Sequence, residues 1–327
     1  MLFSLRRGGL ISFLLVSTFA VSSGVMAQSA TYPSRPIHIV VAGTAGGESD
    51  IIARLLAADL QPRLNVSVVV DNKPGAGVGL AAGYVAQAKP DGYTLLLAGS
   101  GLVISPSILK SALDPVKDFT PISQLLSLEF YLAVPASIKV QTLQELVQWT
   151  KSGAVKNVSY ASAGLGSISH LQMEVLKSLT KIEALQIPYK GTLLALNGML
   201  GGDTQLMFVG YSGAPHFRNG TLRPLAIAMP KRSTEFPQVP TIGEVYPDFN
   251  VFAWAGLVGP PNLPAAIVEK LNAAVAAVVA EPGFIAKMNT AVGGQPASST
   301  PQSMGERLRS ESARYSALAL SLGIKPE

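Results

Sequence analysis

Two glycine-rich turns, one in each half of the chain, carry the clearest chemical signal in the sequence. The first spans residues 43–50 after an apolar run at 37–41, and the second spans 162–170 after a run at 158–161. Glycine allows positive φ angles and close approach of a ligand, and the helix start expected after each turn offers unpaired N–H groups and partial positive charge. Such a turn binds an anion without a basic side chain. Either turn alone could be only a tight connection, but the pair predicts an anion site if both face one cleft.

Side chains in these turns and in two further turns are weaker candidates. Asp50 lies in the first turn of its expected helix and could serve only to complement the helix dipole. His170 stands near a helix start, where a hydrogen-bonded structural histidine is as reasonable as a ligand contact. Ser100 and Tyr211 each follow an apolar run and could line the same cleft, with Tyr211 stacking on a ligand. Ordinary loop chemistry is the alternative for both of these residues.

Enzyme signatures in the sequence are weak. Ser100, Ser162 and Ser212 lie in glycine-rich turns, but no base with an orienting acid is recognisable for any of them. Residues 210–214 lack the final glycine of a nucleophile elbow, and residues 77–82 fit a dinucleotide fingerprint without the strand that should precede it. The histidines are far apart and cysteine is absent, which argues against a metal site. We predict no catalytic residue, no cofactor and no metal; an exported hydrolase using one of these serines is the alternative.

The N-terminus and the charge indicate where the protein works. Arg6 and Arg7 precede an apolar run at 10–21, and residues 25–27 fit the small-residue rule for cleavage, so a signal peptide at 1–27 is predicted. A membrane anchor is the alternative, but the run is shorter than the roughly 20 residues that a span needs. The net charge is +5 with scattered basic residues, which predicts no nucleic-acid partner. We therefore expect a periplasmic protein, and a monomer.

Strand and helix patterns alternate along the rest of the chain and must position the turns. Capping boxes at Thr142 and Thr241, and an N-cap at Thr300 followed by Pro301, mark helix starts. The expected strands are 37–41, 66–70, 94–98, 129–134, 158–161, 184–188, 205–209, 223–228 and 252–258. The expected helices are 50–60, 78–88, 142–151, 168–179, 265–280 and 300–320. This alternation predicts an α/β fold with a parallel or mixed sheet, and the length suggests two lobes.

A series of motifs, in order along essentially the whole mature chain, resembles one known family. The motifs are Tyr32-Pro33-Ser34-Arg35-Pro36-Ile37, Ala45-Gly46-Gly47 with Asp50 and Ala53-Arg54, Asp71-Asn72-Lys73-Pro74-Gly75-Ala76-Gly77, Pro90-Asp91-Gly92-Tyr93-Thr94-Leu95, Asp118-Phe119-Thr120-Pro121, Pro188-Tyr189-Lys190-Gly191, Gly220 with Leu222-Arg223, Pro237 with Val239-Pro240-Thr241, and Trp254 with Gly256. With them the chain resembles the Bug-type extracytoplasmic receptors of tripartite tricarboxylate transporters.

The resemblance implies a two-lobed periplasmic binding protein of type II-like architecture with a two-strand hinge. Lobe one would hold residues 28–130 and 251–327, and lobe two would hold residues 131–250. The hinge strands would lie near 130 and 251. The resemblance also implies a receptor that captures a small carboxylate for the membrane permease subunits of a tripartite tricarboxylate transporter, or for a sensor protein if it is an orphan receptor.

Ligand contacts are implied by the same resemblance. In the family, such turns hold a carboxylate through backbone amides, small hydroxyls and ordered water. The residues that correspond in this sequence are Thr44, Ala45, Gly46 and Gly47 from lobe one and Ser162, Ala163, Gly166 and Ser167 from lobe two. His170 falls where the family usually has a histidine.

This sequence departs from the family pattern at two places near the expected site. Ala42 and Gly43 stand where the family commonly has Pro and an aromatic residue. After Met207-Phe208 the family often carries an Asp that could meet the ammonium group of an amino acid, but here Val209 and Gly210 follow. We therefore expect a dicarboxylate or an aromatic acid as the ligand in preference to an amino acid.

Overall fold

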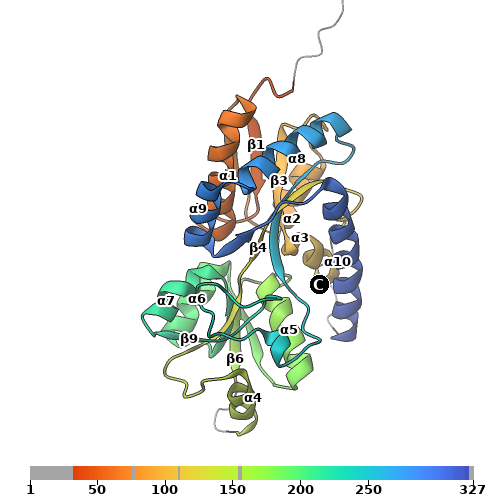
Figure 1. Cartoon of the computed structure of the whole chain (residues 1–327). Coiled ribbons are helices and arrows are strands. Elements are labelled where there is room, and N and C mark those ends of the chain that lie inside the picture. The colour runs from red at the N-terminus through yellow and green to blue at the C-terminus, as the bar shows by residue number, and fades with distance from the viewer. Residues whose placement is uncertain (1–31, 76–77, 110, 154–156, 324–327) are drawn as a thin grey trace, which may run out of the picture. The chain divides into compact units, whose positions relative to one another are not determined.

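Two β-sheets, each flanked by helices, organise the protein (Figure 1). The computed structural model describes residues 32–327 apart from 76–77, 110, 154–156 and 324–327. The predicted signal peptide at 1–27 lies outside these described residues. Each sheet mixes parallel and antiparallel strands, so the predicted α/β class is confirmed.

The first sheet has the strand order β11-β4-β10-β3-β1-β2. Its strands are β1 (Ile37–Val41), β2 (Val68–Asn72), β3 (Thr94–Gly99), β4 (Thr120–Leu128), β10 (Ala253–Gly259) and β11 (Gly294–Pro296). Strands β1, β2 and β3 are parallel, whereas β10 runs antiparallel to both β3 and β4. Strand β1 is buried at every residue except His38, as expected of a parallel strand covered on both faces.

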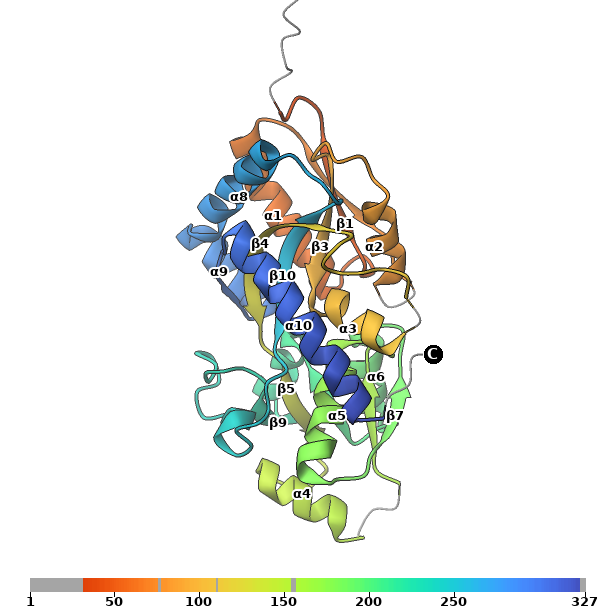
Figure 2. The same ribbon diagram turned by 90° about the vertical axis from the view of Figure 1, so that its right-hand side faces the viewer.

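Six helices flank the first sheet. They are α1 (Glu48–Leu64), α2 (Gly79–Ala86), α3 (Ser100–Ile108), α8 (Ala265–Val279), α9 (Pro282–Val292) and α10 (Pro301–Ser321). Helix α1 packs against α8 and α9, and α10 packs against α3 and β4. Figure 2 shows α10 lying across the face of this sheet. Helix α3 follows β3 directly, and α1 follows β1 after the turn at 42–47, so both helices begin at the carboxyl ends of parallel strands.

The second sheet has the strand order β7-β6-β8-β5-β9. Its strands are β5 (Tyr131–Pro135), β6 (Ser159–Ser162), β7 (Leu185–Pro188), β8 (Leu206–Val209) and β9 (Leu222–Ile227). The helices around it are α4 (Leu143–Lys151), α5 (Ile168–Thr180), α6 (Thr192–Gly201) and α7 (Ala214–Arg218), with short 3₁₀ turns at Tyr211–Gly213 and Ile242–Glu244. Strand β6 runs parallel to β7 and β8, which places the start of α5 at their carboxyl ends.

The chain passes between the sheets twice. It leaves β4 at Leu128 and enters β5 at Tyr131, and it returns from β9 to β10 through residues 228–252. At the first passage the buried Glu129 accepts hydrogen bonds from the hydroxyl groups of Tyr131 and Ser233. At the second, the side-chain amide of Gln172 on α5 donates to the Val251 carbonyl over 3.1 Å. Both passages are therefore tied by buried polar contacts.

Local capping signals confirm three of the predicted helix starts. The Thr142 hydroxyl accepts a hydrogen bond from the Glu145 N–H at 3.1 Å, and Thr241 forms a complete capping box with Glu244. The Thr300 hydroxyl accepts from the Ser303 N–H at the start of α10. Side-chain oxygens satisfy helix N–H groups at all three places.

Six elements of the described residues are absent from the predicted set: β4, β11, α3, α6, α7 and α9. Strand β4 interleaves polar residues with apolar ones, and they are buried because Ser123 and Gln124 hydrogen-bond to Ser299. Helices α3 and α6 begin at glycine-rich turns, and α3 also contains Pro106. Their apolar periodicity is too weak for recognition from sequence, and tertiary packing decides their structure.

Candidate ligand-binding site

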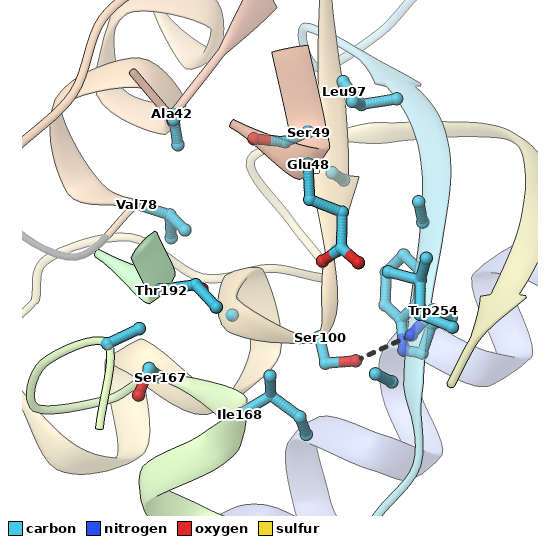
Figure 3. Close-up of a pocket in the computed structure, with 18 of the residues that line it drawn as sticks. Ala42, Glu48, Ser49, Val78, Leu97, Ser100, Ser167, Ile168, Thr192 and Trp254 are labelled. Atoms are coloured by element: carbon cyan, nitrogen blue, oxygen red, sulfur yellow. Dashed lines mark hydrogen bonds between the residues drawn. The ribbon is translucent and has the colours of Figure 1, made fainter. Parts of the chain in front are cut away.

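A cavity of about 270 Å³ takes lining residues from both lobes. Elements of the first sheet contribute Ala42, Glu48 and Trp254, and elements of the second contribute Ser167 and Thr192 (Figure 3). In Figure 3 these side chains surround one common space. The cavity therefore lies where the two lobes meet.

The starts of several helices line this cavity. They are Glu48 and Ser49 of α1, Ser100 of α3, Ile168 of α5 and Thr192 of α6. The first N–H groups of a helix have no intrahelical acceptor, and the helix dipole adds partial positive charge there. Among the described lining residues there is no Lys, Arg or His. The arrangement suits an anion that backbone groups bind without a basic side chain.

Two glycines allow the turns before α3 and α5 to pack closely against neighbouring elements. A Cβ atom on Gly99, the N-cap of α3, would lie 3.0 Å from the Trp254 carbonyl oxygen, so a side chain there would meet the backbone of β10. Gly166 has φ +72°, and its Cβ position is 3.4 Å from the Cα of Ser105 on α3. The second-lobe turn therefore packs directly against a first-lobe helix.

The first predicted turn is held by Asp50, which is buried. Its carboxylate accepts a hydrogen bond of 2.9 Å from the Gly46 N–H and pairs with Arg54. Burial acts to raise the pKa of Asp50, but the hydrogen bonds from Arg54 and Gly46 outweigh it and lower the pKa. Asp50 thus closes the turn and positions the start of α1.

All the predicted ligand-binding residues of the first turn lie apart from the cavity lining. Thr44, Ala45 and Gly46 are exposed, and the Gly47 N–H donates to the Thr44 carbonyl over 3.1 Å. Neither these four residues nor Asp50 is among the lining residues in the part of the chain that the structure describes. The neighbouring Gly43, Glu48 and Ser49 line the cavity instead.

The second predicted turn contributes Ala163, Gly166 and Ser167 to the lining. The Ser167 hydroxyl donates to the Gly164 carbonyl over 2.7 Å and accepts from the His170 N–H, so it caps α5. Ser162 is fully buried and accepts a 2.8 Å hydrogen bond from the Gln186 side chain. The local hydrogen bonds of these hydroxyls hold the turn in the shape that brings the start of α5 to the cavity.

Of the other three predicted side chains, Ser100 lies at the cavity, whereas His170 and Tyr211 do not. Ser100 lines the cavity, but its hydroxyl donates to the Phe252 carbonyl at 3.3 Å and accepts from the Trp254 N–H at 3.1 Å. His170 and Tyr211 are buried and are not among the described lining residues. Burial lowers the pKa of His170, and the Tyr211 hydroxyl donates to Glu235 over 2.6 Å.

The cavity walls are mostly apolar. Ile52, Leu97, Leu128, Phe130 and Leu165 contribute aliphatic and aromatic surface alongside the Trp254 ring. A ligand with an apolar body would gain from contact with this surface.

Sequence reasoning missed Glu48, whose carboxylate points into the cavity (Figure 3). Burial raises the pKa of Glu48 to about 7. A signal for it existed in the sequence. Residues four apart share a helix face, and Glu48 is in register with Ile52, Leu56 and Leu60, which are all buried. An acid that begins an apolar stripe lies on the inward face of its helix, and here it lines the cavity.

Comparison with known proteins places this geometry in a family. Residues 52–324 match the model of the tripartite tricarboxylate transporter family receptor. The periplasmic binding protein BugD is 32% identical with a TM-score of 0.82, over 90% of this chain and all of that one. An R. palustris protein solved with adipate is 31% identical with a TM-score of 0.84, over 90% of this chain and 100% of its own. MatC from Rhodopseudomonas palustris, solved with bound malate, is 32% identical with a TM-score of 0.78, over 88% and 99% of the two chains. This chain therefore belongs to the receptor family of tripartite tricarboxylate transporters, a family of two-lobed periplasmic solute-binding proteins that are not enzymes.

Proposed function

We propose that this protein is a periplasmic receptor that captures a small carboxylate between its lobes and delivers it to a tripartite permease. One observation carries the proposal: helix N-termini from both lobes meet at one cavity, with no basic side chain among the described lining residues. A carboxylate matches the size and charge that such N–H groups bind. Glu48 and Ser49 from α1, and Ser167 and Ile168 from α5, provide the facing backbone.

The walls and the relatives narrow the ligand class. The cavity of about 270 Å³ and its apolar lining suit a small acid with an apolar body. The solved relatives named above hold adipate and malate, which are both dicarboxylates. An aromatic acid or a short dicarboxylate is therefore the proposed class, with ring or chain against Trp254 and Phe130.

Binding is coupled to hinge closure in this proposal. Residues near 130 and 251 form the hinge, lobe one holds 28–130 and 251–327, and lobe two holds 131–250. A ligand that contacts both lobes stabilises the closed state over the open one. Small-angle scattering should show a smaller radius of gyration with saturating ligand, and an unchanged radius would contradict closure.

Export and delivery complete the proposal. Residues 1–27 direct secretion and are cleaved, and the closed receptor then docks as a monomer on the permease subunits. A sensor protein takes the place of the permease if the receptor serves signalling.

A thermal-shift screen with matched pairs tests the receptor function. Each acid is paired with its neutral amide, as benzoate with benzamide and adipate with adipamide. A ligand that binds only the folded state raises Tm. The proposal expects at least one acid to raise Tm with no effect from its amide. Equal shifts from acid and amide, or turnover of a bound compound, would contradict it.

A further inference from the structure

Glu48 places an acidic group inside a mostly apolar cavity. Figure 3 shows its side chain extending from the start of α1, with both carboxylate oxygens directed toward the space between Ser100 and Trp254. Among the described lining residues it is the one titratable side chain. Any ligand in this cavity must accommodate it.

The described residues offer the Glu48 carboxylate no hydrogen-bond or ion-pair partner. By contrast, the neighbouring acid Asp50 is held by Gly46 and Arg54. Burial alone raises the pKa of Glu48, and no charged neighbour contributes to that shift. Glu48 is half-buried, and a carboxylate that is partly withdrawn from water without a partner is destabilised. A ligand group that pairs with it would therefore stabilise it.

The Glu48 carboxylate also reaches the second lobe. Its Oε1 lies 3.0 Å from the position that a Cβ atom would take on Gly210, just after β8. Glycine leaves this space open to the first-lobe acid. The expectation against an amine-bearing ligand rested on the missing acid after Phe208. Glu48 brings a carboxylate from the opposite lobe to the same place.

We propose that Glu48 determines ligand specificity by pairing with a protonated amine, so that the ligand is a carboxylate with an apolar body and an ammonium group. The ligand carboxylate lies at the helix N-termini, and its ammonium group lies against the cavity side of the Glu48 carboxylate, near the end of β8. This inference rests on the proposed carboxylate-receptor function and changes its ligand class: an acid with an ammonium group takes the place of the short dicarboxylate proposed above. A second ligand carboxylate at this position would face the acid of Glu48 and be disfavoured.

Calorimetric titration with three ligands that share one benzoate end tests the assignment. The probes are para-(aminomethyl)benzoate, para-methylbenzoate and terephthalate, which place an ammonium, a methyl or a carboxylate opposite the same benzoate. A parallel linear series uses δ-aminopentanoate, pentanoate and glutarate. The proteins are the mature wild type, Glu48→Gln, and Glu269→Gln as control, because Glu269 is exposed on α8 away from the cavity lining. Gln keeps the size of Glu48 and removes its charge.

The wild type should bind the ammonium member of a series about tenfold or more tightly than the methyl member, and the dicarboxylate least tightly. Glu48→Gln should lose this preference by about tenfold while binding of the methyl member stays within about twofold. Glu269→Gln should behave as the wild type.

The failures of this inference and of the receptor function are distinct. Carboxylate binding without an ammonium preference, a preference for the dicarboxylate, or an unchanged preference in Glu48→Gln would overturn the role of Glu48 alone. Absence of binding by every member of both series would overturn it together with the proposed receptor function.

Discussion

The indole N–H of Trp254 donates a 2.7 Å hydrogen bond to the buried carboxylate of Glu311. Trp254 belongs to β10 and lines the cavity, whereas Glu311 lies on α10, the helix that packs against β4 and α3. Arg307 in turn pairs with Glu311 over 2.9 Å. The Trp254 side chain in the cavity wall is thus held in place by its hydrogen bond to Glu311, which does not involve the ligand.

Replacing Glu311 should separate support of this wall from ligand contact. Glu311→Leu leaves the indole N–H of Trp254 without its acceptor and should lower the free energy of unfolding by about 1–3 kcal/mol. Glu311→Gln keeps a side-chain acceptor and should lose less. Urea unfolding of the two variants measures the difference. Equal losses in both would show that the hydrogen bond to Trp254 is not what Glu311 contributes.

Ser100→Ala should affect stability more than binding. The Ser100 hydroxyl donates to the Phe252 carbonyl and accepts from the backbone N–H of Trp254. Its loss leaves this buried backbone donor unpaired, at a cost of about 1–3 kcal/mol. Thermal unfolding and calorimetric titration with the best carboxylate measure both effects. A loss of affinity of tenfold or more, with unchanged stability, would instead make Ser100 a direct ligand contact.

Gly166→Ala should weaken ligand binding through the turn that packs on α3. Gly166 has φ +72°, where a side chain costs about 1–2 kcal/mol. Gly220→Ala is the matched control, because Gly220 has φ +73° and its Cβ would meet nothing within 4 Å. Both variants should lose similar stability, but only Gly166→Ala should also lose affinity in the same titration. Equal ligand affinities of the two variants would show that the second turn does not contribute to binding.

Glu48 should make stability depend on pH in the absence of ligand. Its pKa is raised from 4.5 to about 7 in the folded state, so between these values the folded protein binds more protons than the unfolded chain. The free energy of unfolding must then fall as pH rises through this window. Burial raises the pKa of Glu311 and Glu129 in the same direction, so the wild type is compared with Glu48→Gln. The variant should show a flatter decline in urea unfolding, and identical slopes would contradict the raised pKa.

Much of the fold could be predicted because its signals are local. The apolar run at 37–41 coincides with β1 (Ile37–Val41), and Thr142, Thr241 and Thr300 cap helices as their sequence patterns indicate. Helix α3 and strand β4 gave no such signal. Their polar residues form hydrogen bonds with residues that are distant in the sequence, as when the Ser123 hydroxyl donates to the Ser299 carbonyl.

The site could be predicted only in outline. Glycine turns before helices identified the right region of each lobe, and Ala163, Gly166 and Ser167 do line the cavity. The inward direction of Glu48, the outward position of Thr44 and the contact of Tyr211 with Glu235 depend on how the turns close. Closure of the first turn is set by the hydrogen bond from Gly46 to Asp50, which the sequence motif does not determine.

Calorimetric titration of the mature wild-type protein with an acid and its matched amide tests the central claim most directly. We expect one site per chain for a small carboxylate, with no detectable heat from the amide, because only the anion gains from the helix N-termini at the cavity. Equal binding of the acid and the amide would contradict the account.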